Sequence, residues 1–84
     1  MSIDFHTVSM MSVREIGITE AEVVMDTVVR RLHRDESVVS VDSAMSGTAV
    51  LSFTVGGEGL SYEALLGQVR AVLESVLGDR FVLL

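Results

Sequence analysis

A glycine-rich turn, Gly56-Gly57-Glu58-Gly59, is the first candidate for a binding site in this 84-residue chain. It follows a strand-like stretch and precedes a helical one, which is where helix N-termini bind phosphate. However, it matches neither the dinucleotide fingerprint nor the P-loop, the chain contains no lysine, and Glu58 would repel an anion. A loop that needs positive backbone angles explains these glycines better.

The two histidines are the next candidates, as metal ligands. Asp4 and His6 share one face of the first predicted strand, and His33 lies near the end of the first predicted helix. One carboxylate and one imidazole are too few for a structural zinc site, and the chain has no cysteine to complete one. The sequence therefore predicts no metal and no cofactor, and His33 suits the negative end of a helix dipole.

The sequence has no arrangement of residues typical of nucleophilic or acid–base catalysis. The chain has many serines, but none lies in the strained Gly-x-Ser-x-Gly turn that exposes a nucleophile. No two carboxylates occur in a setting that would push their pKa values apart. We therefore predict no catalytic residue and no enzymatic activity.

Arg30, Arg31 and Arg34 form a basic cluster in a chain of net charge -6. Cations are favoured in the last turns of a helix, and Asp26 stands four residues before Arg30, where it can form an ion pair. The alternative is that the cluster docks an acidic partner or an RNA phosphate. Because nucleic-acid binders are usually basic, we predict no nucleic-acid partner for the chain as a whole.

Residues 48–55 are the strongest strand signal and the element that would organise the others. Apolar and polar or β-branched residues alternate there with a period of two, which is typical of a half-buried strand. One face carries Ala49, Leu51, Phe53 and Val55; the other carries Thr48, Val50, Ser52 and Thr54.

Further strands are predicted over 3–13, 37–45 and 80–84. In the first, the apolar residues change phase near Thr7, which predicts a bulge there or, alternatively, an extended arm that pairs with another chain. In the second, Val39 and Val41 share one face and Val38 lies on the other.

Two amphipathic helices are predicted, over 19–34 and 61–77. Thr19 and Glu22 have the spacing of a capping box at the start of the first. Ser61 is placed to cap the second helix, and Gly78 to end it.

The resulting order, β-α-β-β-α-β, predicts a single α+β domain over 1–84 with the ferredoxin-like arrangement. In this arrangement both helices cover one face of a four-stranded antiparallel sheet. The first and third strands are central, and the shorter second and fourth strands lie at the edges.

Composition points to association. Apolar residues make up 49% of the sequence and the mean hydropathy is +0.51, which is high for a domain with so much surface for its volume. No run approaches the roughly 18 apolar residues of a membrane span, and the N-terminus lacks the pattern of a signal peptide. We expect a soluble cytoplasmic protein without a membrane partner, whose surplus apolar surface is covered by self-association.

Two surfaces are predicted to mediate this association. The outward side of the second helix carries small residues, and the face of the sheet away from the helices is flat and uncharged, with Val8 or Met10 near it. Gly67 should cost about 0.5–1 kcal/mol relative to alanine in mid-helix, so either a close neighbour requires it or it is incidental. The predicted interface residues are Ala64, Gly67, Ala71 and Ser75 on the helix and Val38, Thr48, Val50, Ser52 and Thr54 on the sheet.

The sequence thus predicts a small acidic assembly module, a homodimer or a higher oligomer, whose acidic rim would also steer it towards a protein partner with a basic surface. One alternative is a regulatory domain that binds a small ligand in a pocket between subunits near Gly56–Gly59. Another is an acidic inhibitor from a phage or mobile element that occupies a basic nucleic-acid-binding surface. The fold by itself does not choose among them.

Overall fold

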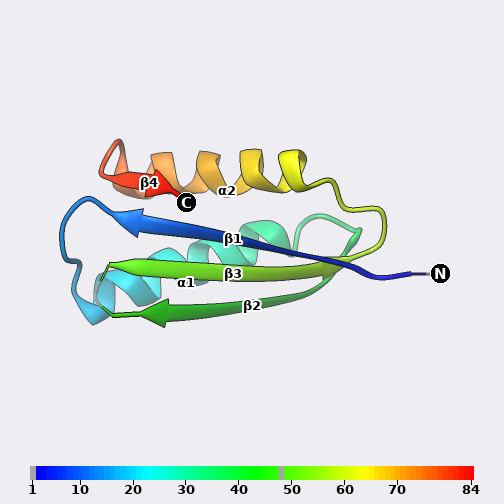
Figure 1. The fold of residues 1–84 in the computed structure, drawn as a ribbon, viewed down its shortest axis with the longest axis horizontal. Coiled ribbons are helices and arrows are strands. Elements are labelled where there is room, and N and C mark those ends of the chain that lie inside the picture. The colour runs from blue at the N-terminus through cyan, green and yellow to red at the C-terminus, as the bar shows by residue number, and fades with distance from the viewer. Residues whose placement is uncertain (1, 48) are drawn as a thin grey trace.

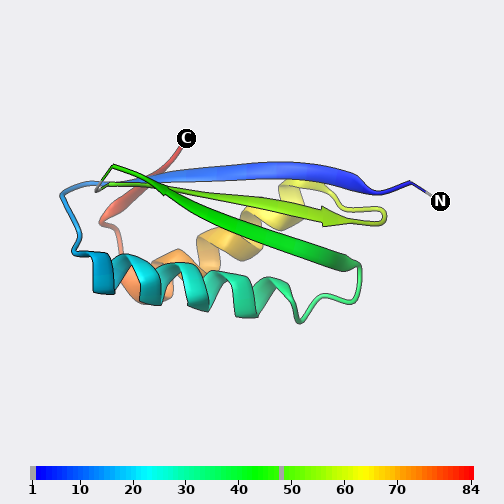
Figure 2. The same ribbon diagram turned by 90° about the horizontal axis from the view of Figure 1, so that it is seen from below.

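Six elements follow one another along the chain in the computed structural model, which describes residues 2–47 and 49–84. They are β1 (Asp4–Ser12), α1 (Ile18–Leu32), β2 (Val38–Ser46), β3 (Val50–Gly57), α2 (Tyr62–Leu77) and β4 (Phe81–Leu83). The strands form one antiparallel sheet in the order β2-β3-β1-β4, and both helices pack against the same face of it (Figures 1 and 2). The predicted ferredoxin-like topology is confirmed, with β1 and β3 at the centre.

β1 and β3 pair in an unbroken register from Asp4 opposite Gly57 to Met11 opposite Val50. The bulge predicted near Thr7 is therefore wrong. The apolar residues of β1 occupy both odd and even positions because both faces of the strand carry apolar side chains. Val8 and Met10 point towards the helices and are buried, whereas Met11 and the residues of its parity point to the other side.

The irregularity lies in β2, where the pairing with β3 shifts between Val38 and Ser40. This bulge reverses the faces predicted for the start of the strand. Val38 is buried in the core at 9% exposure, whereas Val39 is 63% exposed. Val38 consequently does not belong to the sheet face that the sequence assigned to it.

The two helices differ in how well their ends were predicted. α1 begins at Ile18, and its N-cap residue Gly17 makes no side-chain hydrogen bond, so the capping box at Thr19 is wrong. α2 begins as predicted, with the Ser61 hydroxyl accepting a hydrogen bond from the Ala64 N–H. It ends at Gly78, whose φ of +66° favours glycine. Neither described helix is long and apolar enough to cross a membrane.

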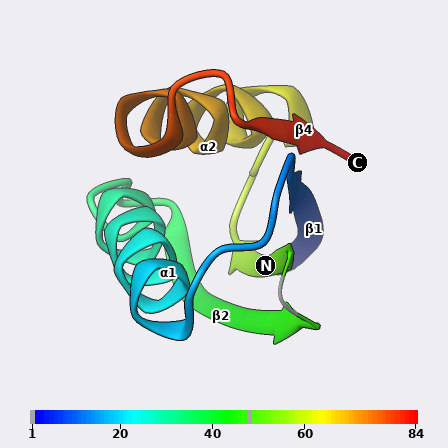
Figure 3. The same ribbon diagram turned by 90° about the vertical axis from the view of Figure 1, so that its left-hand side faces the viewer.

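The core lies between the sheet and the two helices, where apolar side chains from all the elements except β4 are buried. Its members are Val8, Met10, Ala21, Val24, Val28, Leu32, Val38, Leu51, Phe53, Val55, Leu65, Val69, Val72, Leu73 and Leu77. Phe53, near the middle of β3, is the largest of those that are fully buried. Viewed end-on, the helices stand on one side of a curved sheet and leave its other side bare (Figure 3).

Candidate interaction surfaces

The side of the sheet that faces away from the helices is formed by alternate strand residues, and we call it the open face. Its members are Phe5, Thr7, Ser9 and Met11 of β1, Val50, Ser52, Thr54 and Gly56 of β3, Ser40, Asp42, Ala44 and Ser46 of β2, and Val82 of β4. Among these described positions Asp42 is the single ionisable side chain, although charged residues make up 21% of the sequence. The predicted residues Val50, Ser52 and Thr54 lie here together; Thr48 lies outside the described residues.

The centre of the open face is polar, but its hydroxyls pair with one another across the strands. The Thr7 and Thr54 Oγ1 atoms are 3.2 Å apart, and the Ser9 and Ser52 Oγ atoms are 3.0 Å apart. Burying a hydroxyl is costly when it loses its hydrogen bonds to water without replacing them. Because these hydroxyls already have partners, covering this part of the sheet would cost less.

Apolar groups lie at both ends of the open face. At one end, Phe5 is 64% exposed and its ring lies across Gly56, where a Cβ atom would come within 2.6 Å of it. At the other end, Met11 is 41% and its cross-strand neighbour Val82 49% exposed. The chain continues beside β1, where the Leu84 N–H donates to the Ser9 carbonyl at 2.9 Å and Leu84 is 62% exposed.

Two of the three glycines in the glycine-rich turn are explained by close packing, and only one by its backbone conformation. Gly56 and Gly57 are buried residues of β3, and a Cβ atom at Gly57 would lie 2.2 Å from the Ser37 carbonyl oxygen. The predicted positive backbone angle is found at Gly59, with a φ of +67°. These glycines are therefore explained without a bound phosphate.

The second predicted surface, the outward side of α2, is exposed as expected. Ala64, Gly67, Ala71 and Ser75 all face solvent. A Cβ atom added at Gly67 would meet nothing within 4 Å. The packing of this chain therefore gives no reason for a glycine there.

A cleft of about 440 Å³ lies where this side of α2 meets the C-terminal half of α1, and we call it the arginine cleft. It is lined by Thr27, Arg30, Arg31 and Arg34 of α1 and the residues that follow it, and by Ala71, Val72 and Ser75 of α2. Arg30 forms the predicted ion pair with Asp26, with Nη2 and Oδ2 3.0 Å apart. The sequence singled out both the arginines and the small residues, but the fold shows that they share one cleft.

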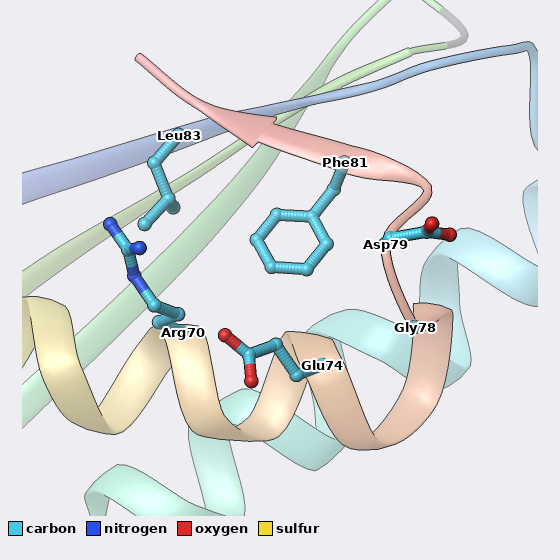
Figure 4. Close-up of a pocket in the computed structure, with 6 residues that line it drawn as sticks. All are labelled: Arg70, Glu74, Gly78, Asp79, Phe81 and Leu83. Atoms are coloured by element: carbon cyan, nitrogen blue, oxygen red, sulfur yellow. The ribbon is translucent and has the colours of Figure 1, made fainter.

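A larger hollow of about 510 Å³ lies between α2 and β4 (Figure 4). The Phe81 side chain extends from β4 towards α2, with Arg70 to one side of the ring and Glu74 on α2 below it, while the Asp79 carboxylate points away from the ring (Figure 4). The groups around it have mixed charge and do not converge on a common point. We assign this hollow no ligand.

His6, the first metal candidate, has a structural role. Its Nε2 donates to the Leu60 carbonyl at 3.1 Å, and its ring lies 5.8 Å from that of Tyr62. These contacts attach the start of β1 to the loop before α2. Within residues 2–47 and 49–84, no three histidine or carboxylate groups gather closely enough to hold a metal ion.

A carboxylate lies beside the glycine-rich turn. Asp35 accepts hydrogen bonds from the Ser37 hydroxyl, from the Ser37 N–H at 2.9 Å and from Gln68 Nε2 at 3.3 Å, and these bonds lower the pKa of Asp35 below its usual 3.8. The same residues and Gly59 line a small hollow of about 140 Å³. A negative charge held in this way is unsuited to a phosphate site.

Comparison of the chain with family models, curated proteins and solved structures finds no match. What the protein does is therefore inferred from its own surfaces.

Proposed function

We propose that the protein is a non-enzymatic assembly module that pairs with a second copy of itself through the open face. The observation that supports the proposal is the scarcity of charge there: Asp42 is the single ionisable group among the described strand positions of that face. The solvated face of an antiparallel sheet normally carries polar side chains, charged ones among them, and the depletion of charged residues is typical of interface centres. Exposed Phe5, Met11 and Val82 supply the apolar contacts.

The size of the open face suits a small dimer. Three strands of eight or nine residues and the three-residue β4, spaced about 4.8 Å apart with about 3.3 Å per residue, span roughly 460 Å² in each copy. The strands of two copies would together bury roughly 900 Å², close to the roughly 1,000 Å² that a specific interface needs. Side chains that project beyond the strands, such as Phe5 and Leu84, add to this area.

The position of Asp42 favours one arrangement of the two copies. Asp42, Thr54 and Thr7 lie at one level across the sheet, and β4 pairs with β1 from Met10 to Ser12, beyond that level. If the twofold axis of the dimer is parallel to the strands, β2 of one copy lies over the β4 edge of the other. Each Asp42 then faces the space beside Thr7 of the other copy, which β4 does not cover and where water can solvate the carboxylate. A twofold axis across the strands would set the two carboxylates close together, which costs energy.

The acidic surface outside the open face has its own role in this proposal. It keeps the assembly soluble and steers it towards a partner with a basic surface. We also place the protein in the cytoplasm, where a chain without cysteine has no disulfide to lose.

A charge placed at the centre of the open face tests the proposal. In the Ser52→Glu variant a carboxylate would be buried against the partner, so the dimer should dissociate at least 100-fold more readily, which corresponds to about 2.7 kcal/mol. Ala64→Glu places the same charge on the outward side of α2 and should leave the dimer intact. Sedimentation velocity over a range of protein concentrations measures both.

Three results would contradict the proposal. The wild type could remain a monomer at tens of micromolar; Ser52→Glu could dimerise as well as the wild type; or Ala64→Glu could be the variant that dissociates. The last result would transfer the interface to α2. Far-ultraviolet circular dichroism of both variants verifies that each remains folded.

A further inference from the structure

We propose that the arginine cleft binds a compact molecule that carries a diphosphate group. The cleft is built from α1 and α2, on the side of the sheet opposite the open face, so this site is separate from the proposed dimer interface. It goes beyond the proposed function, and neither one requires the other.

The charge of the cleft is the first support. Arg30, Arg31 and Arg34 are three of the six basic residues in a chain of net charge -6, and no acidic residue lines the cleft beside them. The Asp26 carboxylate pairs with Arg30, while within the described residues Arg31 and Arg34 have no ion pair. Guanidinium groups so close together repel one another, and a multivalent anion between them would relieve that repulsion.

The shape of the cleft is the second support. The side chains that α2 presents there are short ones, those of Ala71, Val72 and Ser75, which leaves room beneath the arginines. Its volume of about 440 Å³ lies in the range of roughly 300–1,000 Å³ that small-molecule sites occupy. The Ser75 hydroxyl can donate to a bound anion, whereas the Thr27 hydroxyl already donates to the Val23 carbonyl at 2.7 Å.

The chemistry of the side chains favours phosphate. A guanidinium presents its N–H donors in a planar fork that matches two oxygens of one phosphate, and the two phosphates of a diphosphate match Arg31 and Arg34, the two arginines of the cleft that have no ion pair within the described residues. A single carboxylate would neutralise one of them. A long polyanion such as RNA would extend beyond the cleft over a protein whose net charge is -6, which repels it, whereas a compact ligand would contact the cleft alone.

Isothermal titration calorimetry with inorganic pyrophosphate as the probe, at about 0.1 M salt, tests the site. We expect one pyrophosphate per chain. The double substitution Arg31→Gln with Arg34→Gln should weaken binding at least tenfold. Arg70→Gln, which removes an arginine of α2 that does not line the cleft, is the matched control and should bind like the wild type. Because the whole chain is negatively charged, general attraction of anions would not produce stoichiometric binding.

Two further titrations distinguish the source of the phosphate and the class of ligand. Adenosine diphosphate that binds as tightly as pyrophosphate, or more tightly, with the same dependence on Arg31 and Arg34 supports a nucleotide ligand. Binding of pyrophosphate alone supports the free anion. The proposal is overturned if pyrophosphate does not bind, if the Arg70→Gln control loses as much affinity as the double variant, or if a short single-stranded oligonucleotide binds more tightly than either. The Ser52→Glu monomer should bind pyrophosphate normally, so failure of the dimer would not affect this result.

Discussion

The two faces of the sheet are built by the same strands, yet they differ in how they are covered. The face towards the helices carries Leu51, Phe53 and Val55 of β3, all fully buried under α1 and α2. The open face carries the residues between them and has no cover within the chain (Figure 3). Even so, it has no more ionisable groups than the face towards the helices: Asp42 is its single one among the described positions, whereas Asp4 and His6 share the side of Val8 and Met10.

This comparison shows that burial and the absence of charge are separate properties of the sheet. A face that simply met water would gain solubility from lysine or glutamate at little cost, and the rest of this chain is rich in glutamate and aspartate. Hydroxyls that pair across strands, such as those of Ser9 and Ser52, can be exposed or covered with little change in energy. The open face therefore has the composition expected of a surface that the proposed dimer would cover.

The largest expected effect is on the helix-covered face. Phe53→Ala removes the largest fully buried side chain and leaves a cavity, so the free energy of unfolding should fall by about 3–5 kcal/mol. Urea denaturation followed by circular dichroism measures the loss. Phe53→Leu, which keeps most of the volume, should cost less than about 1.5 kcal/mol. If both substitutions cost the same, shape and cavity would not determine the stability of this face.

The same substitution on the open face should act on association instead of folding. Phe5→Ala removes a ring that is 64% exposed, so the unfolding free energy of the monomer should fall by no more than about 0.5–1 kcal/mol. Dimerisation should weaken about tenfold, or about 1.4 kcal/mol, because an aromatic anchor is lost from the interface. Sedimentation at several concentrations separates the two effects. A large loss of monomer stability with unchanged association would remove the distinction between the faces.

The helix-covered face could be predicted from the sequence because one strand shows it plainly. In residues 48–55 every second side chain is apolar, and each predicted helix has an apolar stripe at helical spacing that can cover those side chains. The phase of β1 could not be predicted, since Phe5 and Val8 are both apolar and point to opposite faces. The pattern alone does not say which of two apolar sets is buried, and the covering helices decide it.

The bulge in β2 and the arginine cleft depend on contacts between distant residues. Val38 is buried because the pairing with β3 shifts next to it, and nothing in the local sequence marks that shift. The arginines of α1 and the small residues Ala71 and Ser75 of α2 were each visible in the sequence. They line one cleft because of the way the two helices pack together, and the spacing of residues within each helix does not predict that packing.

Lowering the pH should affect folding and association differently, because the helix side contains a carboxylate whose hydrogen bonds stabilise the fold. The pKa of Asp35 is lowered by the Ser37 hydroxyl and N–H and by Gln68, so its charge stabilises the folded state above its usual pKa of 3.8. That contribution is lost as the pH falls through the lowered value.

Asp35→Asn tests this effect. At pH 7 the variant should be less stable than the wild type by no more than about 1 kcal/mol, because the amide keeps part of the hydrogen bonding and water screens the charge of a partly exposed carboxylate. The difference should shrink to zero as the pH falls below the lowered pKa of Asp35. Urea denaturation of both proteins between pH 7 and pH 2 measures it. Association at pH 7 should be unchanged, because Asp35 does not lie on the open face. A difference in stability that persists at low pH would contradict the stabilising role proposed for the Asp35 charge.

The smallest effect concerns Gly67, which tests whether α2 competes with the open face as an interface. In this chain a Cβ atom at Gly67 would meet nothing within 4 Å, so Gly67→Ala should raise the free energy of unfolding by about 0.5–1 kcal/mol through helix propensity alone. Dimerisation should not change, since the open face lies on the other side of the molecule. If a second chain packed closely against Gly67, the added methyl group would instead weaken association while still stabilising the monomer. Thermal unfolding of dilute protein and sedimentation of concentrated protein distinguish these outcomes, and weakened association would give α2 a place in the interface.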